Sequence, residues 1–378
     1  MMNIVGTAAA IAADTLRTRG RGLKNGLARR HGQRLVVFES DDWGSQRVPS
    51  RAVMTGLIAD GLISGDNPYD RDTLESARDI ETLSDILSSV RDAGGNHAVF
   101  TCYANPANPD FDAIRGEGFE HYIWEPVTAT HDRRGDRREA QAAWRAAIQA
   151  GLMVPEFHGR EHLHVGLWMK YLHSSPMVRA GFDRGFYSVP EPALPPPAKG
   201  FRAACFFTEM AEVPEIADII MSGADCFKTV FGRAPSVFCP TNNIFHPLLY
   251  PVVRAAGCRA VIRHARNLQP DGRGGVRSVW GKRGVAAADL AWFGRNAIFE
   301  PALGYGVEHA LRGISSAFAW GVPAIIATHR LNYVGGIEPS VRDNGARTLR
   351  TLLDTIVRRW PDVRFASSTE LIEDKAEQ

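Results

Sequence analysis

The sequence lacks any apolar run as long as a membrane span, and it has no marked excess of charge of either sign. A transmembrane helix needs about 18–20 consecutive apolar residues, so we expect no membrane-spanning segment. The 378 residues include 44 basic and 42 acidic side chains, a formal net charge of only +2. Because the charges balance, the protein has no strong positive potential that would attract nucleic acid. We therefore do not expect nucleic acid as a partner. A hydrophobic content of 44% is instead typical of a globular protein with a sizeable core.

The sequence also lacks a cysteine pattern. Its five cysteines are scattered, and no two have the C-x-x-C spacing: Cys102, Cys205, Cys226, Cys239 and Cys258. An odd, unpatterned set indicates neither a zinc ribbon nor a disulfide framework. Such a set suits a reducing compartment, so we expect a cytoplasmic protein.

The N-terminal segment does not have the features of a signal peptide. Residues 1–13 are mildly apolar but carry no leading positive charge. The segment that follows is basic, with positive side chains at Arg17, Arg19, Arg21, Lys24, Arg29, Arg30 and Arg34. We expect residues 1–33 to be a solvated, partly helical extension, with peripheral contact to an anionic membrane surface as the alternative. Residues 34–378 are expected to form one domain with loop insertions.

Two adjacent carboxylates at the end of an apolar run are the most informative feature present. The run from Arg34 to Glu39 predicts a buried strand, and Ser40, Asp41 and Asp42 follow it directly. Like charges resist joint ionisation, so such a pair is costly unless a metal or a catalytic role accounts for it. A solvated surface turn is the alternative, because most acidic pairs lie on surfaces.

A second feature is the H-x-x-x-H spacing of His158 and His162. Histidines four residues apart share one face of a helical turn, so both imidazoles can reach one ion. Neutral imidazole suits zinc and similar metals, and a carboxylate is a common further ligand. The same segment also matches H-x-x-E-H, a metallopeptidase pattern in which Glu161 would be the base. We expect neither Glu161 nor His164, two residues beyond His162, to be a ligand.

The third feature is a strand-like run, residues 323–328, that ends in His329. A histidine at the carboxyl end of a barrel strand is a common position for a catalytic acid or base. A histidine at the edge of the core, hydrogen-bonded to backbone, is an equally good interpretation of this run by itself.

Taken in order, these three features resemble the polysaccharide deacetylase family, the NodB-homology carbohydrate esterases. The resemblance implies that Asp41 is the general base and His329 the general acid. It also implies that Asp42, His158 and His162 hold one divalent metal ion, with zinc expected and cobalt, nickel, iron or manganese as alternatives. The family's fold, a distorted (β/α) barrel, is implied for this chain, which would be a divergent member.

Two further motifs of that family are degenerate here. Ser236–Asn243 resembles the third motif, but the family's Arg and Tyr are absent and only Pro240 is retained. Thr241 would then supply the backbone N–H for the oxyanion, with Asn242 beside it. Arg295, in the stretch where the fourth motif is missing, is the candidate to replace the arginine that steadies the base.

Alternating strand and helix patterns independently predict an α/β fold with its site at the carboxyl ends of parallel strands. We expect helices over residues 73–93, 138–150, 213–231, 247–256 and 341–359, with strands near 98–102, 260–262 and 363–366. Residues 190–200 and 267–284 are expected to be loops.

The function that the resemblance implies is removal of acetyl groups from N-acetylated sugars of a polysaccharide or glycoconjugate. The base and the acid would approach the scissile amide from opposite sides. A metal-dependent amidohydrolase acting on a non-sugar amide, an H-x-x-E-H metallopeptidase and a non-catalytic carbohydrate-binding relative remain as alternatives.

Overall fold

The computed structural model of this chain describes Asn25 and residues 30–135, 137–194, 200–263, 266–280 and 289–376. Most of the predicted N-terminal extension therefore lies outside the described residues. Asn25 and His31 are described and contact the domain, through Ser316, Asn296 and the Gly321 carbonyl. No described helix is long and apolar enough to cross a membrane.

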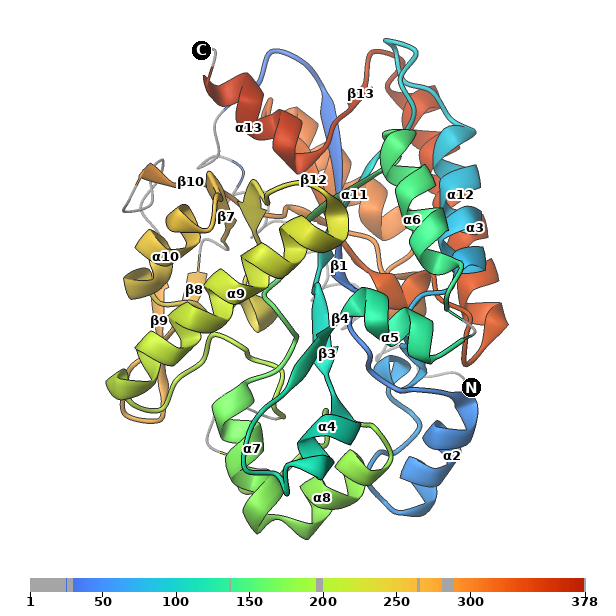
Figure 1. The fold of residues 1–378 in the computed structure, drawn as a ribbon. Helices are drawn as coiled ribbons and strands as arrows, with labels where there is room; N and C mark the ends of the chain where they lie inside the picture. Colours follow the sequence, from blue (N-terminus) through green and yellow to red (C-terminus); the bar gives the residue numbers. More distant parts are fainter. Residues whose placement is uncertain are drawn as a thin grey trace, which may run out of the picture.

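The main sheet is parallel throughout its described pairings, with strand order β10-β7-β6-β5-β2-β1-β12-β11 and β13 beside β1. Its strands are β1 (Leu35–Trp43), β2 (Phe100–Ala104), β5 (Met153–Phe157), β6 (Val237–Phe238), β7 (Ala260–Ile262), β10 (Ala291–Phe293), β11 (Ala297–Ile298), β12 (Ala324–His329) and β13 (Arg364–Phe365). Two antiparallel pairs lie apart from it: β3 (Ala107–Pro109) with β4 (Trp124–Pro126), and β8 (Arg266–Pro270) with β9 (Val276–Trp280). The predicted α/β fold with a curled parallel sheet is confirmed (Figure 1).

Helices connect these strands and cover the sheet, with α9 crossing its front in Figure 1. They are α2 (Arg51–Ala59), α3 (Ala77–Ser88), α4 (Phe111–Gly116), α5 (Val127–Arg133), α6 (Ala140–Gln149), α7 (Val165–Ser174), α8 (Pro176–Asp183), α9 (Val213–Phe231), α10 (Tyr250–Ala255), α11 (Val307–Ala319), α12 (Pro339–Arg359) and α13 (Ser368–Ala376). The predicted bounds of α9 and β7 are confirmed, and α3, α6 and α12 lie within a few residues of prediction. Local chemistry explains such ends: Ser76 and Asp79 form a capping box at the start of α3.

The loop predicted over residues 267–284 is wrong for its described part, because β8 and β9 form a hairpin there. Glycine and arginine dominate the sequence of this stretch and conceal the alternation of its strands. Asn267, Gln269 and Pro270 are the buried positions of β8, and the two that alternate along the strand, Asn267 and Gln269, are polar.

Alternation along β1 sorts its side chains between the two faces of the sheet. Val36 and Phe38 pack with α3, α6, α9, α11 and α12 in the main core. Leu35 and Val37 belong to a second cluster on the inner face, to which α13 contributes. Residues of the same parity further along β1 therefore also face inward, and Asp41 is one of them.

Candidate active site

Asp41 and Asp42 are consecutive residues of β1, and regular alternation would send them to opposite faces. The register between β1 and β2 shifts between Ser40 and Trp43, and Asp42 has a φ of 76°. Aspartate tolerates this left-handed backbone better than most residues do. Both carboxylates consequently line one cavity of about 230 Å³ at the carboxyl ends of the strands.

The turn after β1 needs a glycine. Gly44 has a φ of +76°, and a Cβ built there would lie 2.3 Å from the Asn105 carbonyl oxygen. The Asn105 N–H donates to the Trp43 carbonyl at 2.8 Å, so the approach of the two chains is fixed. This close contact holds the end of β1, and with it the acidic pair, against the end of β2.

His158 directly follows β5, and His162 lies in the bends that connect this strand to α7. The prediction that the H-x-x-x-H segment forms a helical turn is wrong, since Gly159 has a φ of +93°. The loop nevertheless brings the two imidazoles together, with ring centroids 5.1 Å apart. A spacing of four fits a tight loop as well as a helix, which explains the error.

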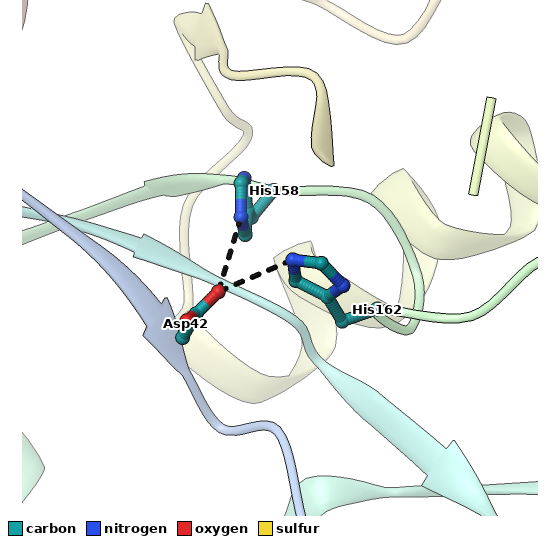
Figure 2. Close-up of side chains that lie close together, drawn as sticks. All are labelled: Asp42, His158 and His162. Carbon is teal, nitrogen blue, oxygen red and sulfur yellow. Dashed lines mark ion pairs between the residues drawn. The ribbon is translucent and has the colours of Figure 1, made fainter. Parts of the chain in front are cut away.

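The predicted triad is assembled from these three residues (Figure 2). The Nε2 atoms of His158 and His162 lie 3.5 and 3.2 Å from Oδ1 of Asp42. All three potential ligand atoms lie within 4.8 Å of one another, and all three residues are buried. Such separations fit ligand atoms placed about 2.1 Å from a single ion.

The protonation states of the triad also suit a cation. His158 uses Nδ1 to contact the Cys239 carbonyl at 2.7 Å, which leaves the Nε2 lone pair free to face Asp42. Burial lowers the pKa of His162 to about 4, with Asp42 opposing it, so this imidazole is neutral at pH 7. Its Nδ1 has no hydrogen-bond partner among the described residues.

Asp42 is held as a carboxylate by Arg47. Burial raises the pKa of Asp42, but the Arg47 guanidinium and the two histidines outweigh it and hold the pKa well below its usual range. Nη2 of Arg47 donates to Oδ2 at 2.8 Å, on the oxygen that faces away from the imidazoles. The donor set is therefore one carboxylate and two imidazole nitrogens, which fits a divalent transition metal such as zinc.

Asp41 is hydrogen-bonded to Arg295, the residue predicted to replace the arginine that is absent from the third motif. Nη1 and Nη2 of Arg295 donate to the two Asp41 oxygens at 2.7 and 2.5 Å, and Nε donates to Glu39 at 2.7 Å. Burial raises the pKa of Asp41, yet Arg295 outweighs it and lowers that pKa below its usual value. Asp41 is thus an oriented carboxylate at neutral pH.

His329 ends β12, the strand beside β1, and is the register partner of Asp41. Its Nδ1 lies 2.5 Å from Glu300, and its Nε2 lies 3.7 Å from Asp41. Burial lowers the pKa of His329, but Glu300 outweighs it and raises that pKa to about 9. The two groups are therefore neighbours in the cavity, and the sides from which they would approach a bound amide stay a prediction.

Thr241 and Asn242 begin a short 3₁₀ helix (Thr241–Asn243) that directly follows Pro240, two residues beyond β6. The Thr241 side chain is buried and accepts from the Ala204 N–H at 2.9 Å. Asn242 and Asn243 both have positive φ, at 54° and 55°. The strained turn places Pro240, Asn242 and Asn243 in the cavity wall, while the role of the Thr241 N–H stays a prediction.

Glu161 and His164, which we expected not to be metal ligands, have other contacts. Both Glu161 oxygens are paired with Arg160, at 2.6 and 3.0 Å. His164 caps α7, with Nδ1 accepting from the Leu167 N–H. Neither belongs to the Asp42, His158 and His162 triad.

Sequence reasoning missed four charged or aromatic residues of the site: Arg47, Tyr69, Arg202 and Glu300. The full lining of the cavity is Asp41, Asp42, Arg47, Tyr69, His158, His162, Arg202, Pro240, Asn242, Asn243 and His329. Glu300 follows β11 by two residues, so its place at a strand end was the available signal. The other three lie in loops and a 3₁₀ helix, with no pattern that marks them.

No family model and no curated protein matches this sequence. Among solved structures, the chain is similar to 4-α-glucanotransferase from Thermococcus litoralis, with a TM-score of 0.46, 11% identity and 91% of this chain covered. It spans 40% of the length of that enzyme.

Two other similar structures carry names from the family that the motifs resemble. One is a protein named as a polysaccharide deacetylase from Mycobacterium smegmatis, with a TM-score of 0.41, 14% identity and 93% of each chain covered. The other is a family 4 acetyl xylan esterase from Clostridium thermocellum in complex with cobalt, with a TM-score of 0.35, 13% identity, and 91% of this chain and 92% of that one covered.

Proposed function

We propose that this protein is a metal-dependent hydrolase that removes acetyl groups from N-acetylated sugars of a polysaccharide or glycoconjugate. One observation carries the proposal: an Asp-His-His triad and an Asp–His pair face a single cavity. A divalent ion held by Asp42, His158 and His162 would polarise the acyl carbonyl and make a bound water more acidic. Zinc fits this donor set, and other divalent transition metals remain possible.

The protein's own groups supply the proton transfers. Asp41, ionised and oriented by Arg295, accepts the proton of the attacking water. His329, protonated at neutral pH through Glu300, donates to the leaving nitrogen. In this proposal the backbone N–H of Thr241, with Asn242 beside it, would stabilise negative charge on the acyl oxygen. The products are acetate and a free amine on the sugar.

The peptidase alternative is disfavoured by the environment of Glu161. A general base must reach the attacking water, but both oxygens of this buried carboxylate are engaged by Arg160. The peptidase interpretation also leaves the Arg295–Asp41 and Glu300–His329 pairs without a role.

The test is acetate release from a panel of N-acetylated oligosaccharides, O-acetylated oligosaccharides and non-sugar acetamides. We expect release from N-acetylated sugars that chelator abolishes and added divalent metal restores. Release from the acetamides alone would favour the non-sugar amidohydrolase. No release from any member, by protein that contains its metal, would contradict the proposal.

A further inference from the structure

Arg202 is a charged residue of the cavity wall that makes no ion pair with a carboxylate in the described part of the chain. Asp41 pairs with Arg295, Asp42 with Arg47, and His329 with Glu300. Arg202 makes no ion pair with any described carboxylate, and its guanidinium carbon lies over the ring of Tyr69, 5.8 Å from the ring centroid. Its side chain is half-buried in the wall that also carries the triad.

The backbone on both sides of Arg202 is fixed. The Phe201 carbonyl accepts from the His164 N–H at 2.7 Å, and the Ala204 N–H donates to Oγ1 of Thr241 at 2.9 Å. The flanking side chains of Phe201 and Ala203 are buried in separate apolar clusters. Arg202 is thus held beside the turn at Thr241, and little ordering is needed for it to bind a ligand.

Arg47 makes a useful contrast, because its guanidinium carbon also lies over the Tyr69 ring, at 4.9 Å. Arg47 is neutralised by Asp42 and Asp72, whose oxygens lie 2.8 and 3.1 Å from its nitrogens. The two arginines therefore lie over the same tyrosine ring, but among the described residues only Arg47 of the two forms ion pairs with carboxylates. Removing a guanidinium from water without a partner is unfavourable, and a bound anion would offset that cost.

We propose that Arg202 binds an anionic group, a carboxylate or a phosphate, carried by the glycan next to the acetylated sugar. The planar guanidinium presents a fork of donors that matches either group. The substrate class is then an acidic acetylated glycan rather than a neutral one. This inference rests on the proposed function, because the anion is placed relative to an acetyl group in the same cavity.

The test compares matched substrates. One is an oligosaccharide in which N-acetylhexosamine alternates with glucuronate, and its control is the same oligosaccharide with the carboxylates reduced to alcohols. A phosphorylated N-acetylhexosamine oligosaccharide, with its unphosphorylated form, separates phosphate from carboxylate. Hydrogen bonds to charged groups lead us to expect a preference of about 10–100-fold in kcat/KM for one acidic substrate.

Substitutions assign that preference to Arg202. We expect Arg202→Gln to bring the ratio of kcat/KM for the acidic and the neutral substrate close to one, through a higher KM for the acidic substrate, whatever its rate on the neutral one. Arg202→Lys should keep part of the preference for the acidic substrate, because lysine retains the positive charge but lacks the forked hydrogen-bond donors of a guanidinium. Arg78→Gln, on the exposed face of α3, removes the same charge away from the cavity and should change nothing.

Binding keeps this inference separate from the proposed function. Calorimetry measures the affinity of the metal-loaded protein and of Arg202→Lys for deacetylated acidic and neutral oligosaccharides, without requiring turnover. If no acetate is released but acidic ligands still bind more tightly through Arg202, the deacetylase proposal fails and the anion site stands. Equal affinity for acidic and neutral ligands in the unmodified protein would overturn the anion site.

Discussion

Two groups of buried charge lie near the ends of β1 and β12, and their hydrogen bonds are satisfied to different degrees. The cavity group consists of Asp41, Asp42, His158, His162 and His329. The second group, which we call the helix-side group, consists of Asp72, Glu75 and Arg330. It lies where α3 and α6 pack. His329 and Arg330 are consecutive residues, so a single step along the chain leads from one group to the other.

The helix-side group is closed on itself. Arg330 is fully buried and donates to Asp72 through Nε and Nη2 at 3.0–3.2 Å, and to Glu75 through Nη1 at 3.0 Å. Glu75 also accepts from the Gly44 N–H and from Nε1 of Trp144. Asp72, Glu75 and Arg330 thus neutralise one another inside the protein, which indicates a structural role.

The cavity group is incomplete by comparison. Two imidazole nitrogens converge on one oxygen of Asp42, and Nδ1 of His162 has no partner among the described residues. Arg47 joins the groups, because it contacts Asp42 on one side and Asp72 on the other. Burial of charge alone therefore does not identify a site. Unsatisfied donors and acceptors that surround a cavity are the features that mark a candidate site.

The largest expected effect is loss of the metal from the cavity group. The double variant His158→Ala/His162→Ala removes two of three ligands, so we expect no bound ion above background by elemental analysis. His173→Ala, on the exposed side of α7, is the matched control and should keep about one ion per chain. Full occupancy in the double variant would rule the site out.

Asp41→Asn should distinguish loss of the proton acceptor from loss of the metal ion. The amide keeps the size of the side chain but cannot accept the proton, and Asp42 is untouched. We expect metal content near that of the unmodified protein and a fall in turnover of about 10²–10⁴-fold, the usual contribution of a general base. Near-normal acetate release by both Asp41→Asn and His329→Ala would show that these residues are not the base and the acid.

The sequence predicted the members of the cavity group well because strand ends bring chemically distinctive residues together. Asp41, Asp42 and His329 each follow an apolar run, and a parallel sheet places such ends at one edge. Arg202 could not be predicted in this way, because it lies in a loop. Glu300 does follow a strand, but only the packing of two segments shows that it meets His329.

The helix-side group was missed for a related reason. Asp72 and Glu75 precede α3 by a few residues, which resembles a solvated helix entry in the sequence. Their burial depends on Arg330, more than 250 positions away in the chain. No local pattern records that contact.

Arg330→Leu should break the helix-side group and leave two carboxylates buried without their cation. Removing one partner of a buried ion pair typically costs about 3–5 kcal/mol of unfolding free energy. We expect a loss of that order in chemical denaturation. Arg350→Leu, which breaks the exposed pair with Asp354, should cost about 0–1 kcal/mol. Equal losses in the two variants would contradict the structural role of the helix-side group.

The smallest expected effect is a shift in pH dependence, and it concerns His329. Glu300 outweighs burial and raises the pKa of His329 from 6.5 to about 9. Glu300→Gln keeps a hydrogen-bonding side chain but removes the negative charge, so the pKa of His329 should fall below about 9. The protonated acid would then be lost at lower pH, and the alkaline limb of the rate profile should move to lower pH with it.

The same variant tests the linkage between protonation and folding. A group whose pKa is higher in the folded state contributes stability that is fully present below its unfolded pKa and is lost as pH rises through its folded pKa. For His329 that window runs from about 6.5 to about 9. The unmodified protein should therefore lose part of its thermal stability between pH 6 and pH 10, and Glu300→Gln should lose less of it. NMR titration of the His329 ring gives both pKa values directly, and an unchanged value in Glu300→Gln would contradict the assigned cause.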